Sequence, residues 1–231
     1  MLLSRKSKDR GKSERIWLTS YHSFSFGEYY DENHMGFRAL RVINEDTVAP
    51  SRGFPPHSHD NMEILTYIIQ GELQHQDSTG SKVIIKQGDV QLMSAGSGIT
   101  HSEYNASSEK PVHLLQIWIH PDKDNLTPSH YERTFPKKPG EPLHLLASKE
   151  GKEGSLQIHQ DVLLYRLILG KNESFAFPIN PNRFIWVQIV KGPVLINGNS
   201  LDAGDGLQVS EETILSFEAI QDTELLLFDL A

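Results

Sequence analysis

The chain has 231 residues, of which 38% are hydrophobic and 23% are charged. These values are ordinary for a globular protein, and the length allows one large or two modest domains. Lys and Arg number 22 against 30 Asp and Glu, and the resulting net charge of −8 argues against nucleic acid as a direct partner. The absence of cysteine excludes disulfides, cysteine nucleophiles and thiolate metal ligands.

The apolar runs and the N-terminal residues indicate where in the cell the protein is expected. The longest apolar runs are strand-sized, well short of the roughly 20 residues that a transmembrane helix needs. The N-terminus turns charged soon after Met-Leu-Leu, so it lacks the apolar core of a signal peptide. We therefore expect a cytoplasmic protein with no membrane partner.

The first segments combine a basic end with an aromatic stretch. Residues 1–15 are rich in Lys, Arg and Ser, a composition typical of a solvated, poorly ordered terminus. Residues 17–30 alternate aromatic and polar residues, which predicts a strand or a hairpin. His22 and His34 lie in this region. A packed or surface position is expected for such isolated histidines, and a position facing the pocket is the alternative.

Short β segments then recur at fairly even spacing along the chain. They are separated by turn dipeptides such as Gln70-Gly71, Gln87-Gly88 and Asn197-Gly198. The expected strands are 39–42, 62–69, 82–86, 90–93, 112–119, 165–169, 184–190, 194–196, 214–217 and 225–228. Many short strands divided by such turns predict an all-β sandwich or jelly-roll barrel. One short helix is expected, near Ser129–Phe135.

Two short polar pairs lie between Gly53 and Asn105, namely His57-x-His59 and His101-x-Glu103. Successive side chains of a strand point to opposite faces, so both members of each pair share one face. If the two strands lie side by side, three imidazoles and one carboxylate converge on one point. This set suits a divalent transition metal better than calcium or magnesium, which prefer oxygen ligands. A metal held this way usually keeps an open position for water or substrate.

A single His-x-His pair is weak evidence by itself. With eleven histidines in the chain, one such pair is expected on the order of 0.5 times by chance, and a surface pair on a loop is the alternative interpretation. The surroundings favour the metal site. Pro55 and Pro56 lead directly into the first pair, and the second pair follows a turn at Gly88-Asp89.

These residues resemble a known family. Gly53, His57-x-His59, Glu63 and Gly71, followed by Gly88-Asp89, Gly96 and His101, resemble the two motifs of the cupin superfamily. More narrowly, GFPPHSHDNMEILTYIIQGEL and GDVQLMSAGSGITHSEYN are similar to the pirin family, in particular to short bacterial members called quercetin 2,3-dioxygenases. The resemblance includes the opening WLTSYHSFSFGEYYDENHMGFRALRVINED and in effect covers the whole chain.

The motifs depart from the general cupin pattern in three ways. Only three residues separate Gly53 from His57, Ser94 replaces the usual proline, and His101 comes two residues late. These departures are themselves similar to pirins, in which the position of Glu103, and not that of Glu63, supplies the carboxylate ligand. The resemblance implies a bicupin, two jelly-roll β-barrels packed together, with His57, His59, His101 and Glu103 as metal ligands.

The second half repeats the first without its ligands. Residues 136–154 are rich in Pro, Gly and charged residues, which predicts an exposed connector with one packed strand near 143–147. We expect an N-terminal barrel over 1–135 that carries the metal site, and a C-terminal barrel over 155–231. When 191–193 is aligned with 70–72, the ligand positions fall on Pro178, Asn180, Phe217 and Ala219, so the C-terminal barrel is expected to lack a metal.

The resemblance implies an oxidoreductase that opens the heterocyclic ring of flavonols such as quercetin with O2 and releases CO. Glu103 is then the catalytic candidate that takes the 3-hydroxyl proton, since a carboxylate beside a metal can alternate between ligand and base. The metal is expected to be Fe2+, with Mn, Ni, Co, Cu and Zn as alternatives that this ligand set does not separate. Apolar residues near the motifs are expected to line the substrate pocket: Phe37, Phe54, Ile64, Met93, Ile99 and Trp118.

Two alternatives remain open at this point. The chain could be a non-enzymatic, iron-binding pirin-type regulator or redox sensor that acts through protein partners. It could also be a metal-dependent enzyme with a different substrate, because cupin barrels host many reactions. A cavity of aromatic size beside an open coordination position favours the enzymes, whereas a closed site favours the sensor.

Overall fold

The computed structural model describes all 231 residues and consists of β-strands with two single-turn helices, η1 (Ser7–Asp9) and η2 (Lys152–Gly154). Neither helix has the length or the apolar character that crossing a membrane requires. The strands form two compact units, each built from two antiparallel sheets. The structure therefore confirms the predicted all-β bicupin class.

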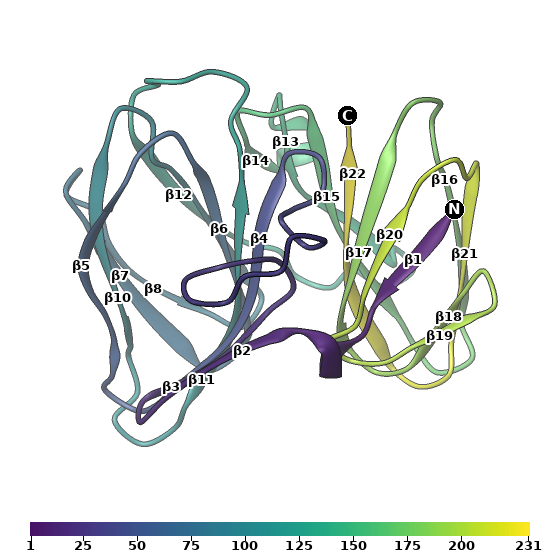
Figure 1. Ribbon diagram of the computed structural model, residues 1–231, viewed down its shortest axis with the longest axis horizontal. Coiled ribbons are helices and arrows are strands. Elements are labelled where there is room, and N and C mark those ends of the chain that lie inside the picture. Colours follow the sequence, from purple (N-terminus) through teal and green to yellow (C-terminus); the bar gives the residue numbers. More distant parts are fainter. The chain divides into compact units, whose positions relative to one another are not determined.

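The first unit, called here the N-terminal barrel, comprises Gly11–Pro136 and Leu156–Gln160. Its larger sheet has the strand order β12-β9-β6-β11-β4-β3-β2 and its smaller sheet the order β5-β10-β7-β8, and Figure 1 shows them facing each other. The bounds are β2 (Gly11–Arg15), β3 (Leu18–His22), β4 (Leu40–Val48), β5 (Gly53–His59), β6 (Glu63–Gln70), β7 (Glu72–Asp77), β8 (Lys82–Lys86), β9 (Asp89–Ser94), β10 (Ile99–Asn105), β11 (Val112–Ile119), β12 (Ser129–Thr134) and β14 (Leu156–Gln157).

The interior of the N-terminal barrel is layered. Along one face of β6, Ile64 belongs to one buried apolar cluster and Ile68 to another, while Thr66 lies between them. Thr66 is one member of a cross-strand polar row, which we define as His22, Asn44, Gln116, Thr66 and Gln91 on β3, β4, β11, β6 and β9. The apolar layers supply the burial that drives folding, and the row between them gives the barrel a polar middle.

The second unit, called here the C-terminal barrel, comprises Met1–Arg10, Lys137–Ser155 and Asp161–Ala231. One sheet runs β1-β20-β17-β22-β15-β13 and the other β16-β21-β18-β19. The bounds are β1 (Leu2–Arg5), β13 (Leu143–Ser148), β15 (Val162–Leu169), β16 (Ser174–Pro178), β17 (Phe184–Lys191), β18 (Val194–Ile196), β19 (Asn199–Leu201), β20 (Gly206–Val209), β21 (Ile214–Ala219) and β22 (Thr223–Leu230).

The predicted internal repeat is visible in the topology. The order β5-β10-β7-β8 of one barrel recurs as β16-β21-β18-β19, and β9-β6-β11-β4 recurs as β20-β17-β22-β15. The strand register differs here from the offset alignment, which had placed Phe217 and Ala219 at the ligand positions. Ile196 pairs with Phe217 as His75 pairs with Glu103, so Leu215 and Phe217 on β21 take the places of His101 and Glu103, and both are buried in a continuous apolar core. The clusters of His, Asp and Glu that could hold a metal all lie in the N-terminal barrel.

The N-terminal segment differs from the expectation of a poorly ordered end. Leu2–Arg5 forms β1, which pairs with β20 from Leu2↔Val209 to Arg5↔Gly206, and Gly11–Arg15 forms β2 beside β3. Pairing with an open sheet edge satisfies the backbone of this segment, and Leu2 packs against the apolar core of the C-terminal barrel. This segment also divides at Arg10 between the two units.

Two further segments depart from the sequence-based description. The helix expected near Ser129–Phe135 is wrong, because β12 occupies Ser129–Thr134 and pairs with β9. Its side chains alternate as in a strand: the His130 side chain is buried and Tyr131 is exposed. In the segment expected to be a connector, the packed strand predicted near 143–147 is present as β13, which pairs with β15 and groups with the C-terminal barrel. The departure is that Leu156–Gln160 groups with the N-terminal barrel.

The packing of Phe217 gives a stability prediction. Phe217 is among the largest fully buried side chains, so Phe217→Ala should lower the unfolding free energy by about 3–5 kcal/mol. Ile214→Ala, on the same strand but at a half-exposed position, is the matched control and should change stability far less. Thermal unfolding followed by circular dichroism measures both, and equal effects of the two substitutions would contradict this account of the core.

Candidate metal centre

The pairing of β5 with β10 brings the two polar motifs together. These strands are antiparallel, and His57 lies directly opposite His101. Because alternate residues share a face, His59 and Glu103 follow on the same side as His57 and His101. The side-by-side arrangement on which the sequence argument depended is therefore present in the structure.

A bulge in β5 adjusts the register beside the site. His57 faces His101 but Phe54 faces Glu103, so β5 carries one extra residue, within Pro55-Pro56. Prolines fit here because they have no N–H to donate to the ladder. Gly53 lies just beyond, where an added Cβ would stand 2.1 Å from the Glu103 carbonyl oxygen. Any larger residue at position 53 would push β5 away from β10.

The rings of His57, His59 and His101 form a compact triangle. Their centroids are 4.4 Å apart for His57–His101, 4.9 Å for His57–His59 and 5.0 Å for His59–His101. Burial lowers the pKa of His59 to about 4 and that of His101 to about 2, with neighbouring imidazoles adding to the effect. Both rings are therefore neutral near pH 7, the form in which imidazole binds metals.

Hydrogen bonds constrain which ring nitrogens are available. His57 Nδ1 is 2.8 Å from the Pro55 carbonyl oxygen, which can only accept, so Nδ1 carries the proton and Nε2 is free to ligate. His101 Nε2 is buried and has no hydrogen-bond partner. An orphaned buried nitrogen is unfavourable unless a ligand satisfies it, and a metal ion fits this position.

Glu103 enters the site from the next inward position of β10. Its side chain is buried, and Oε2 accepts a hydrogen bond of 2.9 Å from Gln116 Nε2 in the polar row. Burial raises the pKa of Glu103, while His75, Gln116 and His57 oppose the increase. Its ligand atom groups with those of His101 and His75, and His101 is shared with the histidine triangle. Glu63, the alternative carboxylate, instead accepts a hydrogen bond from Ser94 and contacts His159.

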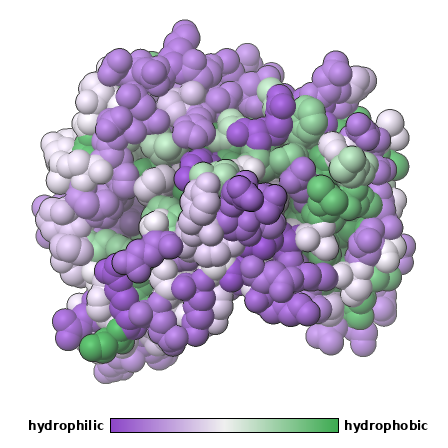
Figure 2. Space-filling model, viewed as in Figure 1, coloured by the Kyte–Doolittle hydropathy of each residue, from purple (hydrophilic) through white to green (hydrophobic).

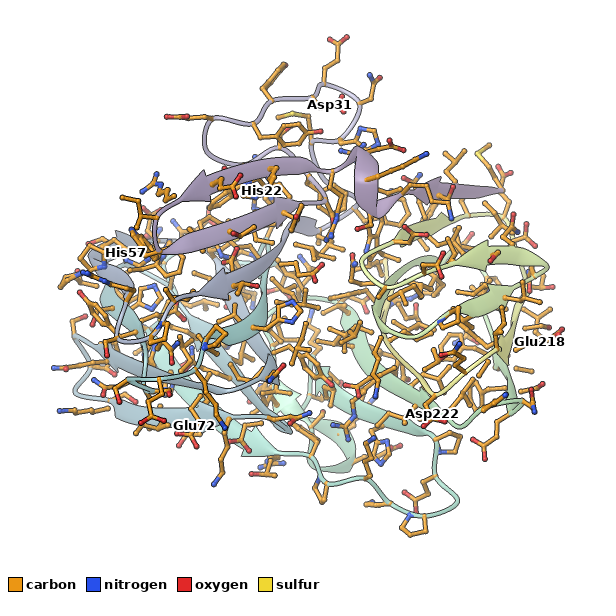
Figure 3. All side chains as sticks on the ribbon, turned by 90° about the horizontal axis from the view of Figure 1, so that it is seen from below. His22, Asp31, His57, Glu72, Glu218 and Asp222 are labelled. Atoms are coloured by element: carbon orange, nitrogen blue, oxygen red, sulfur yellow. The ribbon has the colours of Figure 1, made fainter.

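A cavity of about 820 Å³ adjoins the histidine triangle. This volume lies in the range of pockets that bury a small organic ligand. His57, His59 and Glu103 line it directly, together with the aromatic residues Phe26, Tyr29, Phe54 and Trp118 and the polar residues Ser20, His22, Asn44, Asp46 and Gln116. Figure 3 shows His22 on the strands next to the loop that carries Asp31.

The apolar residues expected around the pocket occupy two kinds of position. Phe54 and Trp118 line the cavity, and Trp118 packs edge-to-face on His59 with centroids 5.0 Å apart. Ile64, Met93 and Ile99 form a buried apolar cluster, and Phe37 is buried beside Leu40. The cavity-lining residues and the core residues are similarly hydrophobic, so the sequence alone could not tell which of them line the cavity.

Several polar residues of the cavity were not singled out from the sequence. Asn44 Oδ1 accepts a hydrogen bond of 2.7 Å from His22 Nδ1. Asp46 lies one inward position further along β4. The signal was present as the alternating pairs Ser20-x-His22 and Asn44-x-Asp46, which have the same spacing as the two metal motifs.

Asp46 is the polar residue of the cavity whose burial is least compensated by hydrogen bonds. It is almost wholly buried and its Oδ1 has no hydrogen-bond partner. Burial raises the pKa of Asp46 to about 7; Ser20 opposes this by hydrogen bonding, and the charges of Glu103 and Glu45 add to it. A neutral or partly ionised carboxyl group thus lies in the cavity near neutral pH.

Comparison with known proteins agrees with this geometry. Residues 4–119 match the family model described as pirin, and residues 145–230 match the quercetinase C-terminal cupin domain. A curated relative, quercetin 2,3-dioxygenase of Escherichia coli strain K12, is 47% identical over 230 residues, covering 100% of this chain and 99% of the relative.

Two solved structures are also close. The crystal structure of YhhW from Escherichia coli superposes with a TM-score of 0.97 at 46% identity, covering 100% of this chain and 98% of the other. A second structure, described as the bacterial pirin YhhW in complex with nickel(II), has a TM-score of 0.96 at 46% identity and covers 100% and 99% of the two chains.

The histidine triangle predicts the metal content of variants. His101→Ala removes the buried orphaned nitrogen and one ligand, so metal loading should be abolished. His120→Ala, which replaces an exposed histidine outside the clusters, should retain the wild-type metal content. Metal per chain is measured by elemental analysis after dialysis, and unchanged loading of the His101 variant would refute the ligand assignment.

The pKa of Asp46 predicts a pH-dependent stability in metal-free protein. Because the folded-state pKa is raised above the unfolded value near 3.8, the unfolded state loses its proton first. The unfolding free energy of the wild type should therefore fall between pH 4 and 7, by on the order of 4 kcal/mol from this group. Asp46→Asn should remove this component, so its advantage over the wild type grows with pH. Denaturant unfolding across this range measures it, and parallel pH curves would contradict the prediction.

Proposed function

The chain belongs to the pirin family, and on that premise we propose that it is a metal-dependent quercetin 2,3-dioxygenase, which opens the heterocyclic ring of flavonols with O2 and releases CO. The observation that carries the proposal is that His57, His59 and Glu103 line the wall of a cavity of about 820 Å³, with His101 buried beside them. A substrate in that cavity would meet the ligands directly. A sensor with a closed site would not need such a space.

His57, His59, His101 and Glu103 are proposed to hold one divalent transition metal. The neutral imidazoles and the carboxylate fit such an ion, and the nickel complex of the similar Escherichia coli pirin supports a divalent metal. The ion would supply Lewis-acid and redox chemistry toward a flavonol oxygen and dioxygen. Iron(II) remains our proposal for its identity, with Mn, Ni, Co, Cu and Zn as the alternatives to be tested.

Glu103 is proposed to receive the proton of the flavonol 3-hydroxyl. Its pKa is raised by burial, which makes it a stronger base than an exposed glutamate. Gln116 donates to Oε2 at 2.9 Å, and the Thr66 hydroxyl, 3.0 Å from Gln116 Oε1, orients that amide. These contacts fix the carboxylate plane, so Glu103 would present the same oxygen to each substrate.

The cavity walls fit a flat polyphenol. Phe26, Phe54 and Trp118 offer apolar surface, and Phe26 packs edge-to-face on Trp118 with centroids 5.3 Å apart. Ser20, Asn44 and Asp46 offer polar groups in the same space, which suits the ring hydroxyls of a flavonol. Together they would hold the substrate and exclude water from its reacting carbon atoms.

The alternative of a non-enzymatic regulator depends on a surface for a protein partner. The face shown in Figure 2 is mostly hydrophilic, with hydrophobic residues in smaller patches. The large exposed hydrophobic residues are spread over the chain from Met1 to Ile220. The cavity beside the ligands is a specific feature of the enzyme interpretation, so we propose the enzyme. A cytoplasmic location remains a prediction.

The proposed activity is tested by quercetin-dependent oxygen uptake. Purified protein is reconstituted anaerobically with each of Fe, Mn, Ni, Co, Cu and Zn, and its metal content is verified before the assay. We expect oxygen uptake with CO release in equal amounts for at least one metal, and none in His101→Ala. No uptake by protein shown to be loaded with each metal would contradict the flavonol dioxygenase and favour another substrate or the sensor.

A further inference from the structure

A second group of polar side chains lies behind the histidine triangle. His75 and Asp77 are on β7, where His75 lies opposite Glu103 and Asp77 opposite His101. The side chains of both are fully buried. Their spacing, His75-x-Asp77, matches that of the metal motifs, and the chemistry described so far does not use them.

Asp77 is anchored as a hydrogen-bond acceptor. Its Oδ1 accepts from Thr79 N at 2.8 Å, Thr79 Oγ1 at 2.6 Å and Ser81 N at 3.3 Å. Its Oδ2 is 2.8 Å from His75 Nε2. A carboxylate can only accept, so His75 Nε2 carries a proton and donates it to Asp77.

The proton on His75 Nε2 determines the state of His101. His75 Nδ1 is 3.4 Å from His101 Nδ1, and one of these two nitrogens must donate. In neutral His75 the proton already sits on Nε2, so Nδ1 accepts and His101 Nδ1–H donates. The proton of His101 is then on Nδ1, and Nε2 keeps its lone pair. Nε2 is the nitrogen that is buried without a hydrogen-bond partner.

We propose that Asp77 and His75 are positioning residues, which hold His101 in the Nδ1–H tautomer so that its Nε2 lone pair faces the metal. The chain of contacts runs from the Asp77 carboxylate through both nitrogens of His75 to His101. Partners of this kind behind a ligand fix its tautomer and strengthen it as a donor. The inference rests on the metal site of the proposed function, but not on flavonol cleavage.

The same residues suggest a competing use as a second metal site. His75, Asp77 and His130 offer ligand atoms within 4.8 Å of one another, and the rings of His75 and His130 stack with centroids 4.3 Å apart. A metal there would need the lone pair of His75 Nε2, which would move the proton of His75 to Nδ1. His101 Nδ1 would then accept, and His101 Nε2 would carry the proton. The second site would therefore disable the first, and we assign the cluster to positioning.

Asp77→Asn is the most informative variant because it should reverse the direction of the hydrogen bonds that run from His101 through His75 to position 77. The donors of Thr79 and Ser81 would keep the amide oxygen in place of Oδ1, so the amide nitrogen would face His75 Nε2. His75 Nε2 would have to accept, His75 Nδ1–H would donate, and His101 would be held with its proton on Nε2. A carboxylate-to-amide change that yields the wrong histidine tautomer is known to impair a catalytic site without disturbing its shape.

Asp89→Asn is the matched control. Asp89 is a buried aspartate of the same barrel that accepts hydrogen bonds from Thr134 Oγ1 at 2.6 Å and Lys86 N at 3.0 Å, away from the histidines. We expect metal affinity, measured by chelator competition with nickel(II), to fall about 10–100-fold in Asp77→Asn. The Asp89 variant should bind nickel(II) as the wild type does.

The tautomer itself provides a readout that a merely structural role would not change. In metal-free protein with 15N-labelled histidine, nuclear magnetic resonance distinguishes Nδ1–H from Nε2–H, and His101→Ala identifies the His101 signals. We expect Nδ1–H in the wild type and Nε2–H in Asp77→Asn. Since the wild-type measurement needs no variant, the test holds even if Asp77→Asn does not fold.

Three results would overturn the proposal. They are Nε2–H on His101 in the wild type, unchanged nickel affinity in folded Asp77→Asn, and two nickel ions per wild-type chain of which His130→Ala loses one. Absence of nickel binding by the wild type, by contrast, would refute the metal site of the proposed function, while the tautomer measurement would still report on the hydrogen bonds from His101 to Asp77. Lack of flavonol cleavage by protein loaded with each of the metals tested above would refute the substrate and leave the positioning role of Asp77 and His75 standing.

Discussion

The antiparallel pairing of β5 with β10 is the constraint on which the site depends. It places His57 opposite His101 and, through the period of the strand, His59 and Glu103 on the same face. The bulge at Pro55-Pro56 turns Phe54 toward Glu103, and the absence of a side chain at Gly53 allows the strands to approach. A slip of one residue in β10 would send His101 and Glu103, both proposed ligands, to the opposite face, so the proposed site requires the register that the bulge and Gly53 fix.

The N-terminal barrel buries many polar groups, and each of them costs free energy unless it has a hydrogen-bond partner. The cross-strand row from His22 to Gln91 lies between two apolar layers; all its members except the partly buried Gln116 are buried, and hydrogen bonds link neighbours within the row. Glu103 is integrated into this network, while His101 Nε2 and Asp46 Oδ1 are left without partners. Buried polar atoms without partners destabilise a fold, and here they lie where a metal and a substrate would satisfy them. The C-terminal barrel places Leu215 and Phe217 at the positions equivalent to His101 and Glu103 and has an apolar interior there.

The all-β class and the shared face of each polar pair were predictable from the sequence because both follow from local periodicity. The bicupin arrangement and the proposed ligand set came from the resemblance to pirins. Alternation and glycine turns indicate strands, and two His/Glu pairs at a spacing of two residues indicate shared faces. The N-terminal strand β1 was missed because it depends on pairing with β20, some two hundred residues away, and on the packing of Leu2 against the core of the C-terminal barrel. β12 was taken for a helix because the sequence S-H-Y-E-R-T carries no strong strand signal of its own. The segment is a strand because it pairs with β9. His75 and Asp77 carried a visible signal, the same spacing as the metal motifs, but their proximity to His101 depends on the pairing of β7 with β10.

The most direct test of the central claim is anomalous X-ray diffraction from crystals of the metal-loaded protein, recorded at the absorption edge of the bound metal. The account predicts one anomalous peak per chain, with His57, His59, His101 and Glu103 within about 2.0–2.2 Å of it. A peak among His75, Asp77 and His130, or in the C-terminal barrel, without one between β5 and β10, would contradict it.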